Sequence, residues 1–188
     1  MRLRPRVASL AAAAGAWLVA SGCVISHPDY PASWSPLVGG STCSVLTGTY
    51  EDRGVEGETG AAVFRGQAVS LSRILFPGET SRATVVVVTG LASDTLEIAS
   101  WDGPRPLKSL RLQAASGDYR CRGGAAEISA TALIGEQVTG AHTDHFKLSK
   151  AGDGSLVLKH STSGFGLILV VPVGGSEDRW YRFKARFE

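Results

Sequence analysis

Short segments rich in valine, isoleucine, leucine and threonine recur along most of this sequence, and glycine or proline separates them. Short runs at such spacing predict an antiparallel all-β domain. Ala68–Leu75 is the exception, because three of its apolar residues share one helical face before Pro77 and Gly78 end the segment, which predicts one short helix. The predicted strands are Ser44–Tyr50, Ala83–Thr89, Thr95–Trp101, Leu107–Gln113, Ala125–Thr131, His145–Lys150, Ser155–Ser161, Gly166–Val171 and Arg179–Phe187.

Two local patterns shape the expected architecture. Gly152-Asp153-Gly154 has the chemistry of a tight hairpin turn between two of these strands. In the last strand, apolar residues alternate with cations at period two. This alternation places Tyr181, Phe183, Ala185 and Phe187 inward, and Arg182, Lys184 and Arg186 outward. We expect an antiparallel barrel or strongly bent sheet of about eight to ten strands with one short helix, the alternative being a two-sheet β-sandwich.

The interior is predicted to be packed with side chains. The run from Phe165 to Val171 is apolar at consecutive positions, so both of its faces need cover. The helix at Ala68–Leu75 is the expected cover for one face, and the aromatic residues of the last strand are expected across the interior. A small barrel is either packed solid or hollow enough for one ligand, and these bulky side chains favour the packed form.

The N-terminus has the layout of a secretory signal peptide. Arg2, Arg4 and Arg6 form a cationic start, and Val7–Ala20 follows without a charge. A membrane-spanning helix needs about 20 apolar residues, so this run is too short to remain as an anchor. Residues 1–22 are therefore predicted to be removed.

Ala20-Ser21-Gly22-Cys23 resembles the bacterial lipobox. The resemblance implies cleavage before Cys23 and a thiol that carries diacylglycerol, with palmitate as a typical further chain. Two or more acyl chains anchor a protein stably, so the membrane is the expected first partner. The alternative is an ordinary secretory signal with Cys23 unmodified.

Position 24 bears on the destination of the chain. In Gram-negative lipoproteins an aspartate directly after the modified cysteine favours the inner membrane, and here that residue is Val24. The resemblance therefore implies the cell envelope, at the periplasmic face of the outer membrane. Secretion to the periplasm or to the cell surface is the alternative.

Residues 23–42 are predicted to form a tether, because prolines, glycines and serines interrupt any apolar period. Tyr30 and Trp34 are expected either to dock this tether on the domain or to lie at lipid headgroups. Residues 43–188 then form a single all-β domain of ordinary size.

Cys43 and Cys121 remain as a pair if Cys23 carries lipid. An even remainder in an exported protein predicts a disulfide, and two separately buried thiols are the alternative. In the chain-entropy model, closing a loop of about 79 residues stabilises a fold by up to roughly 4.5 kcal/mol.

Charge and motifs exclude several functions. The chain has 19 basic and 17 acidic residues, and loss of the three signal arginines reverses this excess, so no nucleic-acid partner is predicted. His142, Asp144 and His145 lie close in sequence. On a strand, however, the side chains at positions i and i+3 point to opposite faces, so His142 and His145 would not converge and no metal site is predicted. The acids near the first strand, which are Glu51, Asp52, Glu56 and Glu58, are expected in a solvated loop. No catalytic motif and no cofactor loop is found, so no enzyme and no cofactor is predicted.

The run from Cys43 to Gly54, the GDGSLVL turn and the closing WYRF strand together resemble small proteobacterial lipoproteins. This resemblance implies a lipid-anchored envelope protein with a non-catalytic structural or partner-binding role, the partner being another envelope protein. The Gly48-Thr49-Tyr50 strand entry is similar to that of lipocalin-like barrels, which implies as an alternative a carrier of a small apolar ligand at unknown residues. A hydrolytic enzyme is the distant alternative.

Overall fold

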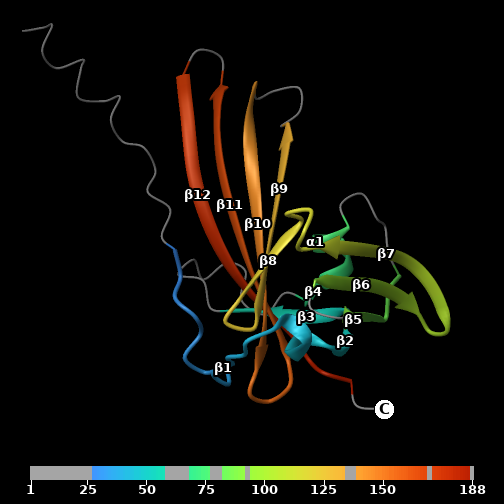
Figure 1. The fold of residues 1–188 in the computed structure, drawn as a ribbon. Helices are drawn as coiled ribbons and strands as arrows, with labels where there is room; N and C mark the ends of the chain where they lie inside the picture. The colour runs from blue at the N-terminus through green and yellow to red at the C-terminus, as the bar shows by residue number, and fades with distance from the viewer. Residues whose placement is uncertain are drawn as a thin grey trace, which may run out of the picture.

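Two antiparallel β-sheets make up most of the described chain (Figure 1). The computed structural model describes residues 27–57, 68–76, 82–91, 94–133, 139–168 and 171–186, and gives only the backbone for 129–142 and 166–173 within these ranges. The all-β prediction is confirmed, with one short α-helix. Across the described strands the sheets do not close into a barrel, so the two-sheet alternative is the nearer description. The predicted signal peptide and Cys23 lie outside the described residues.

The larger sheet has eight strands in the order β4-β3-β12-β11-β10-β9-β8, and β1 pairs with β10 beside this path. Its strands are β1 (Leu37–Val38), β3 (Arg53–Glu56), β4 (Ala68–Ser70), β8 (Tyr119–Arg122), β9 (Ala125–Leu133), β10 (Thr139–Ala151), β11 (Leu156–Ile168) and β12 (Val171–Phe183).

The smaller sheet has four strands in the order β2-β5-β6-β7. They are β2 (Gly48–Glu51), β5 (Val85–Leu91), β6 (Thr95–Asp102) and β7 (Arg105–Gln113). Two short helices accompany the sheets, the 3-10 helix η1 (Cys43–Leu46) and the α-helix α1 (Leu71–Leu75). In the described residues no helix is long and apolar enough to cross a membrane.

Three local predictions change in the structure. The first half of the predicted strand Ser44–Tyr50 is η1. The predicted helix Ala68–Leu75 is helical only from Leu71, because Ser70 is its N-cap, with a side chain that accepts a hydrogen bond from the Arg73 amide. Gly166–Val171 is not a strand of its own: β11 continues to Ile168, and β12 begins opposite it at Val171.

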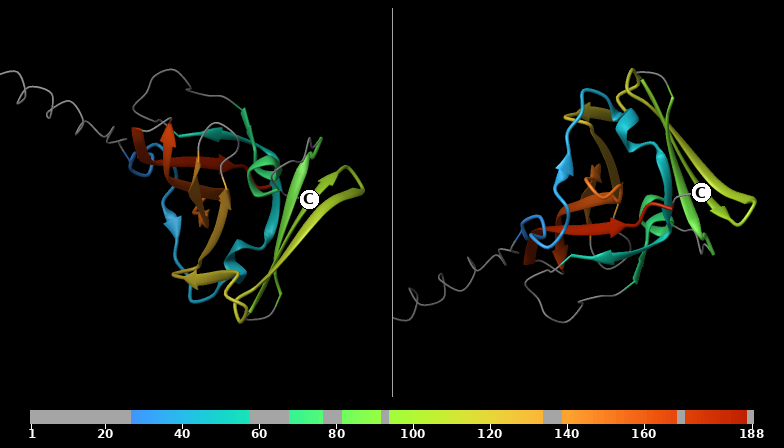
Figure 2. Two further views of the ribbon diagram at one scale, coloured as in Figure 1. Left: turned by 90° about the horizontal axis from the view of Figure 1, so that it is seen from above. Right: turned by 90° about the horizontal axis from the view of Figure 1, so that it is seen from below.

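β10, β11 and β12 are each 13 residues long, which corresponds to about 43 Å. The smaller sheet lies at only one end of these strands, and their other end projects beyond it (Figures 1 and 2). We call residues 139–145 of β10, 161–168 of β11 and 171–178 of β12 the projecting half. The remainder of these strands is the covered half.

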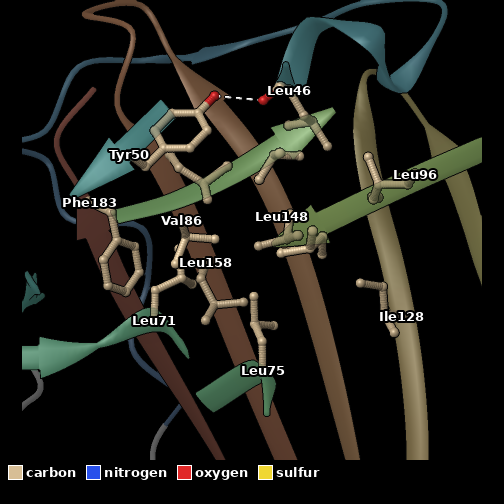
Figure 3. Packing of buried hydrophobic residues seen from close by; sticks show 14 of the residues in the cluster. Leu46, Tyr50, Leu71, Leu75, Val86, Leu96, Ile128, Leu148, Leu158 and Phe183 are labelled. Atoms are coloured by element: carbon tan, nitrogen blue, oxygen red, sulfur yellow. Dashed lines mark hydrogen bonds between the residues drawn. The ribbon is translucent and has the colours of Figure 1, made fainter. Parts of the chain in front are cut away.

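The hydrophobic core lies between the smaller sheet and the covered half (Figure 3). Tyr50 and Phe183 are its largest fully buried side chains. The Tyr50 hydroxyl donates to the Leu46 carbonyl at 2.6 Å, and burial raises the pKa of Tyr50 to about 12. The predicted alternation of the last strand is confirmed over residues 181–186, with Tyr181 and Phe183 buried. Phe187 lies outside the described residues.

A disulfide joins η1 to β8, which confirms the predicted pairing. Cys43 and Cys121 have Cα atoms 5.8 Å apart and are separated by 78 residues, and this Cα distance is ordinary for a disulfide. The cross-link connects the start of the domain to the far edge of the larger sheet. It therefore restricts the unfolded chain over a long loop.

The chain passes between the two sheets at Asp52, which follows β2 and precedes β3. The Asp52 side chain is only 1% exposed, and its carboxylate accepts hydrogen bonds from the Ser70 hydroxyl and the Ser72 amide, both at 2.8 Å. Its own amide donates to the Thr84 carbonyl at 3.0 Å, and its carbonyl accepts from the Leu71 amide at 2.9 Å. One residue thus connects both sheets and the start of α1. The expectation of a solvated acidic loop is wrong for Asp52, because its side chain is buried and its carboxyl oxygens accept hydrogen bonds from Ser70 and Ser72.

Replacement of Asp52 by alanine is expected to lower the free energy of unfolding by about 3 kcal/mol, because buried donors lose a charged acceptor. Asp52→Asn keeps an acceptor of the same shape and should lose clearly less. Urea unfolding measures both, and Asp102→Ala at an exposed position is the control, expected within about 0.5 kcal/mol of the wild type. Equal losses for Asp52→Ala and Asp102→Ala would contradict this role.

Candidate functional site

The inner face of the larger sheet changes from apolar to polar where the smaller sheet ends. Side chains two residues apart on a strand share a face. Leu158 of β11 and Tyr181 of β12 belong to the core, and the next positions on the same face are polar. These residues are Asp144 on β10, His160 and Thr162 on β11, and Glu177 and Arg179 on β12. We call them the His160 cluster.

Strand register brings this cluster together. Thr162 lies opposite Asp144 on one side and opposite Glu177 on the other, and His160 lies opposite Arg179. The Asp144 Oδ1 atom is 2.9 Å from His160 Nε2, and Thr162 Oγ1 donates to the same carboxylate oxygen at 3.2 Å. Residues far apart in sequence thereby form one hydrogen-bonded group.

The geometry of His160 differs from that of a catalytic triad. In a triad the carboxylate binds one ring nitrogen and the nucleophile binds the other. Here Asp144 Oδ1 and Thr162 Oγ1, which is 3.2 Å away, both contact Nε2. The His160 ring also stacks on Phe146, with centroids 4.7 Å apart and planes at 26°. These contacts fix the orientation of the imidazole, and they do not align Thr162 as a nucleophile.

Charge is paired within the remainder of the cluster. The Arg179 guanidinium donates two hydrogen bonds to the Glu177 carboxylate, at 2.8 and 2.9 Å, and these bonds raise the pKa of Arg179. Burial raises the pKa of Glu56, and the nearby Arg179 charge opposes this shift. A surface hollow of about 260 Å³ is lined by His160, Thr162, Glu177 and Arg179. It presents a cation, a carboxylate, a hydroxyl and an imidazole within one small opening.

The predicted candidate residues separate in the structure. β10 is extended through His142–His145, so the backbone places Asp144 and His145 on opposite faces. Across the described residues no group of three or more His, Cys, Asp or Glu side chains could hold a metal ion. His160, which lies beside Asp144, was missed, because the pairing of β10 with β11 depends on register that short motifs do not contain.

The acids predicted in one loop are also dispersed. Glu51 is exposed on β2 and Glu56 lies on β3 near Arg179, while Asp52 is buried between them. Glu58 lies outside the described residues. Paired carboxylates are therefore not formed by the described acids of this run.

The outer face of the larger sheet holds residues 27–38, which we call the N-terminal strap. The Tyr30 ring packs edge-on against Trp180 at 5.3 Å and against Trp34 at 5.9 Å. The Trp180 indole donates to the Pro28 carbonyl at 2.9 Å, and β1 pairs with β10 through Leu37–Val38. The structure thus confirms docking of the two predicted aromatic residues on the domain.

An ion-pair group secures the start of the strap. Asp178 lies 3.2 Å from His27 and 2.7 Å from Lys159. Burial opposes ionisation of Asp178, but hydrogen bonds from Lys159 and Ser161 hold the pKa of this carboxyl below its usual range. The Lys159 ammonium also lies 5.4 Å from the Trp180 ring centroid. The strap is therefore held by both aromatic and charged contacts.

The exposure of Phe165 shows that the prediction of cover on both faces of its segment is wrong at this position. Its side chain is 64% exposed at the projecting half. The expected cover, α1, instead places Leu71 and Leu75 in the core of the covered half. In the described chain neither the smaller sheet, which packs on the other face, nor the strap covers the Phe165 ring.

Replacement of Tyr30 by alanine is expected to loosen the strap, because it removes the aromatic contact with Trp180 on β12. Such a contact contributes about 0.5–1.5 kcal/mol, so the undocked population should rise roughly two- to tenfold. Limited chymotrypsin digestion after Trp34 measures this opening, and Tyr30→Phe, which keeps the ring, is the control. Equal cleavage rates for wild type and Tyr30→Ala would show that the strap is held by other contacts.

No protein-family model, curated protein or solved structure matches this chain. We therefore infer function from the sequence and from the geometry described above.

Proposed function

We propose that this chain is a lipid-anchored envelope protein, acylated on Cys23, with a structural or partner-binding role and no catalytic activity. The observation that carries the proposal is the docked strap directly behind the lipobox-like sequence. The four residues from Cys23 to His27 span at most about 14 Å. An acyl group on Cys23 would thus hold the folded domain close to the membrane and not at the end of a long free tether.

The His160 cluster is the surface that we propose for a protein partner. It lies on the inner face of the sheet at the edge of the smaller sheet, and its hollow is lined by polar and charged groups. The contacts of His160 and Thr162 favour recognition over nucleophilic chemistry, because these side chains orient each other. Oriented polar groups in a half-buried surface are suited to specific hydrogen bonding with a partner.

The packed core supports this role over that of an apolar-ligand carrier. Leucine, valine and aromatic side chains from both sheets fill the space between them (Figure 3). Carriers of apolar ligands need a cavity lined mostly by apolar groups. The hollow at the His160 cluster is lined instead by residues that carry charged or hydrogen-bonding groups.

Acylation is tested by the mass of the N-terminal peptide of the mature protein, isolated from a Gram-negative host. We expect acylated Cys23 and recovery in the outer membrane. Cys23→Ser should give unprocessed precursor or released protein. Val24→Asp should move the acylated protein to the inner membrane, with Val24→Ala as the matched control. An unmodified Cys23 peptide with unchanged membrane retention would overturn the proposal.

Partner binding is tested by a photo-crosslinking residue at position 162 in intact cells. We expect a discrete adduct with an envelope protein, and we expect Arg179→Glu to abolish most of it, because the charge facing the partner is reversed. The control carries the photo-crosslinking residue at position 184 instead, an exposed position directly after β12 and away from the His160 cluster. Identical adducts from both positions would contradict a binding surface at the His160 cluster.

A further inference from the structure

We infer that the projecting ends of strands β11 and β12 enter the interface of the lipid bilayer to which the chain is anchored. This inference rests on the proposed function and adds to it a second point of membrane contact. The segment concerned is Phe165–Ile168 of β11 together with Val171–Val173 of β12, which we call the apolar tip.

Exposure of Phe165 is the first observation. Its backbone pairs with Gly174 on β12, and a Cβ atom at Gly174 would lie 3.5 Å from the Phe165 ring. The ring thus lies beside a position without a side chain, and it is 64% exposed. Phe165 has the largest exposed fraction among the large hydrophobic side chains that the structure describes.

Absence of charge is the second observation. From Ser163 to Ser176 the sequence contains no Asp, Glu, Lys, Arg or His. The described residues of the apolar tip are large and apolar at most positions, namely Phe165, Leu167, Ile168, Val171, Pro172 and Val173. A charged side chain is costly in the bilayer interior, so this end of the sheet has the composition that a membrane accepts.

The position of the strap is the third observation, and it favours a lipid bilayer as the surface that contacts the apolar tip. The His27 ring contacts Ser176 at 3.0 Å and Asp178 at 3.2 Å. Ser176 lies two residues from Gly174, or about 7 Å along the strand. His27, four residues after Cys23 in sequence, therefore lies on the projecting half near the apolar tip. An acyl anchor on Cys23 and the ring of Phe165 would reach the same membrane.

The backbone limits how deeply the tip enters. β3 pairs with β12 only at Tyr181 and Arg182, so in the described chain no strand pairs with the outer edge of β12 at Val171–Val173. Unpaired backbone groups are not tolerated in the hydrocarbon core. Insertion is therefore confined to the headgroup region and the upper acyl chains, where water still reaches this edge.

The test uses full-length mature protein in vesicles of phosphatidylethanolamine and phosphatidylglycerol. An environment-sensitive fluorophore is attached to Phe165→Cys, or to Val38→Cys at the opposite end of the larger sheet, where Val38 is 42% exposed. We expect a blue shift and loss of most emission on quenching by brominated acyl chains at position 165, and neither effect at position 38. Equal quenching at the two positions would overturn the inference.

A second variant keeps Phe165 in place. A fluorophore on Ser163→Cys, an exposed position on the same strand, should be quenched less than one at position 165, and Phe165→Asp in that background should abolish the quenching. Fluorescence at position 163 that quenches itself as protein concentration rises, without quenching by brominated lipid, would show that the tip binds a second copy of this chain. That result would overturn the inference.

The N-terminal peptide mass, measured on the same preparations, separates the two proposals. Acylated Cys23 without quenching at position 165 overturns membrane insertion of the apolar tip and leaves the proposed function intact. Unmodified Cys23 overturns the proposed anchor, and the unacylated protein is then mixed with the same vesicles. Quenching at position 165 in that mixture supports the tip as an independent membrane contact, and its absence overturns the tip as well.

Discussion

The buried carboxylate of Asp52 connects the parts of this fold that are otherwise separate. It accepts a hydrogen bond from the Ser72 amide in the first turn of α1, while the backbone of the same residue bonds to the Thr84 carbonyl and the Leu71 amide. Gly54, two residues later, lies against Phe183 so closely that any side chain at position 54 would collide with the ring. The passage from β2 to β3 therefore determines where both the helix and the last strand lie. A buried carboxyl group is tolerated at such a point because both of its oxygens accept hydrogen bonds, from the Ser70 hydroxyl and the Ser72 amide.

Strand length gives the molecule its two distinct surfaces. β10, β11 and β12 are longer than the smaller sheet can cover, so one face of the same strands is core at Leu158 and becomes a polar surface at Thr162. The opposite face carries the strap near Trp180 and an exposed phenylalanine at position 165. Both candidate sites thus follow from one feature, a sheet that extends beyond its covering layer.

The sequence predicts features that depend on neighbouring residues better than features that depend on strand pairing. The alternation over Tyr181–Arg186 and the Gly152–Gly154 turn are local, and both are confirmed, with Gly154 at a φ of 84°. The Cys43–Cys121 pair followed from counting cysteines. The long hairpin was read as three shorter strands, because glycines suggested breaks, yet Gly164 and Gly175 pair directly. The contact of His160 with Asp144 and the burial of Asp52 arise only once distant segments meet. The role of Cys23 stays a prediction.

The place of β12 in the larger sheet has a consequence for how the chain matures. β12 comes last in sequence among the described strands, yet it lies between β11 and β3, and the bridge from Ala185 to Tyr50 continues its path into the smaller sheet. A chain that emerges N-terminus first cannot pair β3 with β12 until Val171–Phe183 has been delivered. Contacts of such long sequence separation form slowly. A nascent chain that still lacks β12 would therefore present the unpaired edge of β11 to chaperones and proteases, and the larger sheet is completed only when β12 pairs with β11 and β3.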